Sequence, residues 1–141
     1  MLNMIFALSI LLLSSTVFSY NVPSEIHEDW VEVVNRIKME CLEQGNTTLE
    51  AVNAIYETWD IDESHNCFLK CVYEKDQYID TEGHFTKALL QRKGLTKENV
   101  KDCEHAVEAY NKETCDRVYY FNKCIIPRAI DDFIHSTKDA A

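Results

Sequence analysis

Glycine and proline are scarce in this sequence of 141 residues, which contains three glycines and two prolines. Sheets with many tight turns use more of both residues, so this scarcity favours a helical fold. Basic residues are also few: 14 lysines and arginines stand against 24 aspartates and glutamates, which gives a formal net charge of −10. Proteins that bind nucleic acid or anionic membrane surfaces need a basic patch, so we expect no nucleic-acid partner.

The sequence also lacks the common catalytic motifs. It contains no nucleophile elbow, no glycine-rich phosphate loop and no zinc-protease helix. No histidine is followed by aspartate, the pair that a small secreted phospholipase would carry. The histidines are scattered along the chain, at His27, His65, His84, His105 and His135. We therefore expect no enzyme activity, no catalytic residue and no cofactor.

Charged residues are absent before Glu25, and an apolar run covers residues 5–18. This run is too short to span a bilayer, and it ends in residues that suit signal-peptide cleavage. We expect residues 1–19 to be a signal peptide and residues 20–141 to form one secreted, extracellular domain. No later stretch is apolar enough to insert into a membrane.

All six cysteines lie in the predicted mature chain: Cys41, Cys67, Cys71, Cys103, Cys115 and Cys124. An even number of cysteines behind a signal peptide indicates three disulfides. The competing interpretation is a metal site made of Cys67, Cys71 and His65. We favour the disulfides and expect no metal, because the thiols of an exported protein are normally oxidised.

Helical spacing limits how these cysteines can pair. Cys67 and Cys71 would share one helix face with Cβ atoms ~5–6 Å apart, whereas a disulfide needs ~3.8 Å. Cys115 and Cys124 are nine residues apart, which at ~100° per residue puts them on opposite sides of a helix. Neither pair should bond internally, but several of the 15 pairings that six cysteines allow stay open.

Apolar residues recur at helical spacing in six segments, at about 24–44, 47–59, 62–72, 85–93, 96–110 and 115–125. Residues 74–83 are polar and predict a loop. Pro127 should interrupt the last helix, leaving an apolar patch around Phe133 and a mobile tail. The expected fold is all-α, a compact array of about six helices stapled by three disulfides around an apolar ligand cavity. Asn46 begins a glycosylation sequon, which is equally well an unused match at a helix start.

The cysteine spacing resembles that of the six-cysteine insect odorant-binding proteins. Successive gaps are 25, 3, 31, 11 and 8 residues, and the 3 and the 8 are characteristic of that family. The segments 67–75, 83–85 and 115–124 are similar to it as well, so the resemblance covers the whole mature chain. It implies the pairs Cys41–Cys71, Cys67–Cys115 and Cys103–Cys124. It also implies a carrier of an odorant, a pheromone or a similar semiochemical.

Candidate ligand-binding residues follow from this resemblance and from the apolar spacing. Val118, Phe121 and Ile125 form one apolar stripe, with Tyr119, Tyr120 and Lys123 on the other side of the helix. The full set of candidates is Ile55, Trp59, Phe68, Phe85, Leu89, Tyr110, Val118, Phe121, Ile125 and Phe133. Tyr56 and Tyr110 would offer hydroxyl groups to an alcohol, an aldehyde or an ester.

The expected partner is a small hydrophobic ligand, with a membrane receptor as a second candidate partner, and the expected state is a monomer or a weak homodimer. Two alternatives stay open. A non-olfactory scavenger of lipids or amines would have the same fold, and a helical signalling protein would have a tightly packed core without a cavity.

Overall fold

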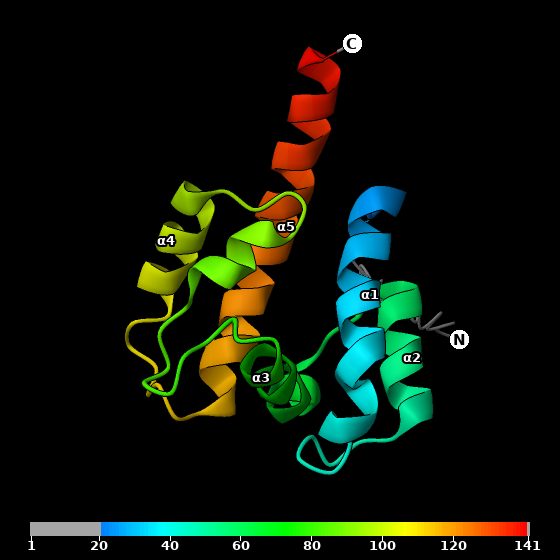
Figure 1. Ribbon diagram of the computed structural model, residues 1–141, viewed down its shortest axis with the longest axis vertical. Coiled ribbons are helices and arrows are strands. Elements are labelled where there is room, and N and C mark those ends of the chain that lie inside the picture. The colour runs from blue at the N-terminus through cyan, green and yellow to red at the C-terminus, as the bar shows by residue number, and fades with distance from the viewer. Residues whose placement is uncertain (1–20, 141) are drawn as a thin grey trace, which may run out of the picture.

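The computed structural model describes residues 21–140, which form five α-helices and two short 3-10 helices (Figure 1). These are α1 (Ser24–Cys41), α2 (Leu49–Thr58), η1 (Glu63–His65), α3 (Asn66–Lys75), η2 (Lys87–Gln91), α4 (Lys97–Ala106) and α5 (Cys115–Asp139). This part of the chain contains no strand, which confirms the all-helical class. The expected signal peptide, residues 1–19, lies outside the described residues.

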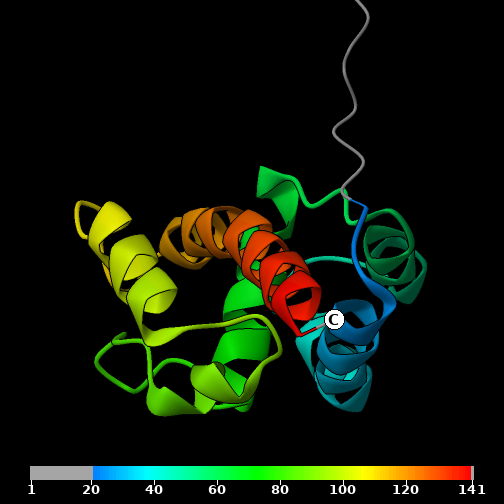
Figure 2. The same ribbon diagram turned by 90° about the horizontal axis from the view of Figure 1, so that it is seen from above.

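The longest helix, α5, lies at the centre of the arrangement. It packs mainly against α3 and α4, while α1 packs against α3 and α2. Figures 1 and 2 show α1 and α2 as an antiparallel pair beside α3, with α4 on the far side of α5. The buried apolar side chains form one core cluster that extends from the α1–α2 pair to α4.

Local sequence explains where α2 and α4 begin. The Thr48 side chain accepts a hydrogen bond from the Ala51 backbone N–H, and the Thr96 side chain accepts one from Asn99. Both are N-cap bonds, which satisfy a donor that a helix start leaves unpaired. The turn before α2 needs Gly45, because a Cβ atom there would lie 2.7 Å from the Cβ of Phe68. Gly45 thus lets this turn pack closely on α3.

Three disulfides connect four of the helices. Cys41–Cys71 joins α1 to α3, Cys67–Cys115 joins α3 to α5, and Cys103–Cys124 joins α4 to α5. The paired Cα atoms lie 5.6, 4.7 and 5.7 Å apart. These are the pairs that the resemblance implies. The helix α2 carries no cysteine, so it is the one α-helix of the described chain without a covalent link to another helix.

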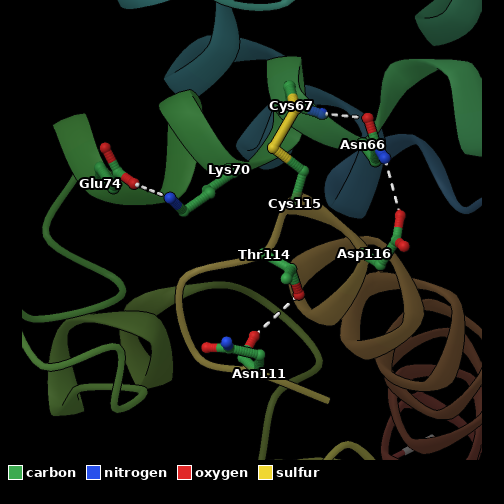
Figure 3. Close-up of a disulfide and its surroundings, with 8 residues drawn as sticks. All are labelled: Asn66, Cys67, Lys70, Glu74, Asn111, Thr114, Cys115 and Asp116. Atoms are coloured by element: carbon green, nitrogen blue, oxygen red, sulfur yellow. Dashed lines mark hydrogen bonds and ion pairs between the residues drawn. A yellow bond between two sulfur atoms is a disulfide. The ribbon is translucent and has the colours of Figure 1, made fainter.

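The Cys67–Cys115 disulfide lies where the first turns of α3 and α5 meet (Figure 3). Beside it, the Asn66 side chain accepts a hydrogen bond from the Cys67 N–H at 2.6 Å. The Asn66 amide also donates to the Asp116 carboxylate at 2.7 Å. Disulfide and hydrogen bonds together set the position of α3 against α5, the two helices that pack most extensively against each other.

Pro127 does not interrupt the last helix, and this prediction was wrong. Helix α5 continues through Pro127 to Asp139, so the segment expected to be a mobile tail is helical. Proline removes one helical hydrogen bond, the one to the Lys123 carbonyl. Buried residues on both sides of the proline, Ile126 and Ala129 among them, stabilise the helix by packing. The final turns project beyond the other helices (Figure 1).

The segment expected as a fourth α-helix is shorter and tighter than predicted. Only Lys87–Gln91 is helical there, and it forms the 3-10 helix η2. Phe85 precedes it and makes an isolated antiparallel bridge with Ile79. The polar segment before it is a loop, as predicted, closed by backbone bonds around Asp80 and His84. The total of about six helices was nevertheless close.

Candidate functional site

A small enclosed cavity lies between α1, α2, α3 and α5. It leaves about 20 Å³ in which a water molecule can be centred. Its walls are almost entirely apolar, and they come from Trp30, Val33, Val34, Tyr56, Trp59, Ile61, Leu69, Val72, Tyr73, Tyr78, Arg92, Asn122 and Ile126. Four helices and the loop around Arg92 thus surround one interior space.

Three tyrosines and one asparagine are among the residues that line this space, although their polar atoms form almost none of its wall. The Tyr73 hydroxyl donates a hydrogen bond to the Asn122 side-chain oxygen at 3.0 Å, and both residues are buried. Burial raises the pKa of Tyr73 well above 10.0, with the nearby Tyr56 and Tyr78 as smaller causes. Burial alone raises the pKa of Tyr56. These phenols are therefore neutral at physiological pH and able to donate hydrogen bonds.

Arg92 closes one side of the cavity. Its Nη1 donates to the Asp29 carbonyl at 3.2 Å and lies 3.6 Å from the Asp29 carboxylate. The same carboxylate accepts a hydrogen bond from the Lys93 N–H at 2.9 Å. These contacts hold the loop after η2 against α1. Tyr78 lies nearby, and burial raises its pKa to about 12 although Arg92 acts in the opposite direction.

Trp59, at the end of α2, forms another part of the wall. Its backbone is in the left-handed region, at φ 57° and ψ 23°, and its N–H bonds to the Ile55 carbonyl at 2.6 Å. The indole N–H donates to Nδ1 of His27 on α1 at 3.0 Å. One side-chain hydrogen bond therefore holds this part of the wall in place.

The predicted ligand-binding residues occupy several environments. Trp59 is the only one of the ten that lines the cavity. Ile55, Phe68, Leu89, Val118, Phe121 and Ile125 are buried in the core. Tyr110 is exposed and stacks on Tyr120, while Phe85 and Phe133 are half-buried. A role in ligand binding stays a prediction for all of them.

Helix α5 turns a different face to the cavity from the one singled out in the sequence. Phe121 stacks on Phe85, with ring centroids 3.8 Å apart, and neither residue lines the cavity. Asn122 and Ile126, four residues apart, share the face that lines the cavity. Tyr119, which the sequence analysis placed on the other side of the helix from the apolar stripe, is also buried at 6% exposure. Helical spacing also places Tyr119, Asn122 and Ile126 near one another on α5. The polar groups of asparagine and tyrosine hid the fact that this second face is buried.

The structure is inconsistent with the metal site considered for Cys67, Cys71 and His65. Both cysteines are bonded to other cysteines and offer no thiolate. Among residues 21–140, no group of three histidine, cysteine or acidic side chains is arranged to hold a metal ion. The same residues include no helix with the length and apolar character of a bilayer span.

Fold and cavity together define a class: a small disulfide-bonded helical protein with an enclosed apolar interior. The sequence model of the PBP/GOBP family matches residues 23–127. The chain therefore belongs to this family, the insect odorant- and pheromone-binding proteins. Its members are carriers of small hydrophobic ligands, not enzymes. No curated protein and no solved structure shows a significant match to the chain.

Proposed function

We propose that this protein is secreted and carries one small hydrophobic ligand, an odorant, a pheromone or a similar semiochemical, through extracellular fluid. The observation that carries this proposal is the enclosed, apolar cavity inside a PBP/GOBP fold. Three disulfides support secretion, because such bonds persist in oxidising compartments. The signal peptide proposed for residues 1–19 would direct export.

The ligand must enlarge the cavity when it enters. The present space is about 20 Å³, whereas pockets for small molecules are ~300–1,000 Å³. Large side chains fill the difference, and two of them, Tyr56 and Trp59, belong to α2 and the residue that caps it. Because α2 has no disulfide, it can shift while α1, α3, α4 and α5 stay linked. We therefore place the opening between α2 and α1.

Two side-chain hydrogen bonds cross this opening, one from Trp59 to His27 and one from Lys38 to the Asn53 oxygen at 2.8 Å. The indole of Trp59 is 7% exposed, and its N–H bond to His27 closes the wall next to the half-buried His27 ring. Breaking this one bond frees a bulky side chain that contributes to the cavity wall. An apolar ligand can thus reach the interior without unfolding the disulfide-linked helices.

Displacement of an environment-sensitive apolar dye by odorants, fatty acids and biogenic amines tests the proposal. We expect saturable binding of one dye molecule at micromolar affinity, which corresponds to about −8 kcal/mol. Val72→Phe, which fills the cavity from α3, should weaken binding at least tenfold. The matched control is Met39→Phe on the exposed face of α1, where the side chain is 63% exposed.

Each outcome separates this function from its alternatives. Displacement by fatty acids or amines alone would favour a scavenger of lipids or amines over a carrier of volatile semiochemicals. Absence of saturable dye binding to the folded protein would contradict a carrier and favour a helical signalling protein. Asn46, an exposed residue in the turn before α2, stays a predicted glycosylation site, tested by enzymatic deglycosylation of the secreted protein.

A further inference from the structure

Two tyrosine rings stack on each other at the surface, where the loop after α4 meets α5. Tyr110 lies in a turn that follows α4, and its N–H donates to the Val107 carbonyl at 3.0 Å. Tyr120 belongs to α5. The ring centroids lie 4.8 Å apart, with 26° between the planes. Because Tyr110 is 36% exposed and Tyr120 is half-buried, a reagent in solution can reach this pair.

This pair differs from the other tyrosines that the structure describes. The remaining four within residues 21–140 are buried: Tyr56, Tyr73, Tyr78 and Tyr119. Tyr73 meets Tyr78, and Tyr119 meets Tyr120, edge to face, with 89° and 67° between the planes. In this part of the chain, only the Tyr110–Tyr120 pair combines exposure with stacked ring faces.

Few other side chains of the described chain compete for an oxidant. All six cysteines are already in disulfides. Trp30 and Trp59 are buried, each with 7% exposure. Met39 is exposed, but its sulfur reacts by taking up an oxygen atom, which is a different modification. A one-electron oxidant should therefore act first on the stacked tyrosines.

Nearby carboxylates favour the removal of an electron from this pair. The pKa of Tyr120 is raised chiefly by the negative charge of Glu63, with partial burial, Tyr110 and Asp116 as smaller causes. Tyr120 is thus a neutral phenol at physiological pH. Loss of an electron gives a phenol a positive charge until its proton leaves, and negative neighbours stabilise that charge.

We propose that Tyr110 and Tyr120 are a site of oxidative modification, at which hydrogen peroxide and a haem peroxidase join the two rings in an intramolecular dityrosine cross-link. Each phenol loses one electron and one proton and becomes a phenoxyl radical. A carbon–carbon bond then forms between one Cε atom of each ring, and the hydrogen on each of these carbons moves to the oxygen of its own ring. Hydrogen peroxide takes up the two electrons and the two protons and becomes two molecules of water.

The stacked geometry suits the bond-forming step. Two such radicals join when their carbons approach through the ring faces, and reacting atoms ~3–3.5 Å apart are close enough to react. Offset-stacked rings bring some of their carbons closer together than their centroids. Tyr110 lies in a turn, so its ring can rotate about the new bond while Tyr120 stays fixed on α5. The product adds a covalent link to Cys103–Cys124, the disulfide that joins α4 to α5.

The modification does not depend on the proposed carrier function. Neither Tyr110 nor Tyr120 lines the cavity between α1, α2, α3 and α5. Cross-linking should therefore leave the affinity for the apolar dye unchanged. A loss of dye affinity in the cross-linked monomer would contradict the position of this pair outside the ligand site.

Treatment of the disulfide-bonded protein with a haem peroxidase and limiting hydrogen peroxide tests the site. The mass of the monomer should fall by two hydrogen atoms, and dityrosine fluorescence should appear. Peptide mapping after reduction of the disulfides should then join the peptides that contain Tyr110 and Tyr120. Oxidation of Met39 is distinguished by mass, because it adds an oxygen atom.

Three variants identify the rings that react. Tyr110→Phe and Tyr120→Phe each keep the ring and remove one hydroxyl, so each should abolish the intramolecular product. Tyr119→Phe is the matched control, because Tyr119 meets Tyr120 edge-on, and it should leave the yield unchanged.

Three outcomes would refute the inference. They are a cross-link mapped to Tyr119, a product found only between two molecules, and no cross-link under conditions that oxidise Met39. Absence of dye binding by the untreated protein would contradict the carrier function alone and leave this inference intact.

Discussion

Phe121→Ala should destabilise the protein strongly, because this ring is at the centre of the core between α3 and α5. The Phe121 side chain is 0% exposed. Its ring stacks on Phe85 at 3.8 Å between centroids and 18° between planes, and it meets the edge of Tyr73 at 6.2 Å. Truncation of a buried phenylalanine to alanine destabilises a protein by ~3–5 kcal/mol. We expect a loss in that range.

Two further variants separate burial from aromatic stacking. Phe121→Leu keeps much of the volume and removes the ring, so its loss should be closer to ~1 kcal/mol, the scale of an aromatic pair. Tyr120→Ala, at the neighbouring half-buried position, should lose ~1 kcal/mol or less. Urea unfolding with the disulfides intact gives all three free energies, and an unchanged m-value shows that the comparison is valid.

The same variants show which face of α5 meets the ligand. With Phe121 in the core, Phe121→Ala should change stability far more than ligand affinity, measured where the variant is still folded. A loss of stability below ~1 kcal/mol together with a tenfold loss of affinity would refute this reasoning. It would place the stripe of Val118, Phe121 and Ile125 in the ligand pocket, as the apolar spacing alone suggests.

Three further predictions concern the helix, the disulfides and the tyrosines. Pro127→Ala restores a helical hydrogen bond to the Lys123 carbonyl and should stabilise the protein by roughly 1 kcal/mol in urea unfolding; a loss of stability would contradict this. Replacing Cys103 and Cys124 together by alanine removes a disulfide between cysteines 21 positions apart in the sequence. Because this disulfide restricts the unfolded chain, its removal should reduce the free energy of unfolding by ~3 kcal/mol, and an unchanged value would contradict that reasoning. Because burial raises the pKa of Tyr78 from 10.0 to about 12, its contribution to stability is complete below pH 10 and decreases as pH rises towards 12. An ultraviolet titration should detect less phenolate in the folded than in the unfolded protein between these values, and coincident curves would disprove the shift.

Much of the fold could be predicted because its signals are local. Helical spacing of apolar residues and threonine N-caps predict where α2 and α4 begin, and the structure has them there. The cysteine positions restricted the disulfides but did not select one pairing, because helical geometry excludes only bonds within a helix. The resemblance to a known family supplied the pairing.

The parts that were missed depend on packing between distant segments. Proline is a strong local signal for a helix end, but buried neighbours of Pro127 on α5 stabilise the helix across it. Asn122 looks like a solvent-facing residue until Tyr73, which is distant in the sequence, is found beside it at 3.0 Å. The cavity wall also includes Arg92 from a loop, and no periodicity marks a loop residue as part of a site.

Intrinsic tryptophan fluorescence tests the central claim most directly. The chain has two tryptophans, Trp30 and Trp59, and both line the cavity. A long-chain ester with a bromine on its apolar end should therefore quench their emission and reach saturation at one molecule per protein. The Val72→Phe variant should show weaker quenching at the same concentration. If equilibrium dialysis detects bound ester while tryptophan emission is unchanged, the ligand binds outside this cavity and the account is contradicted.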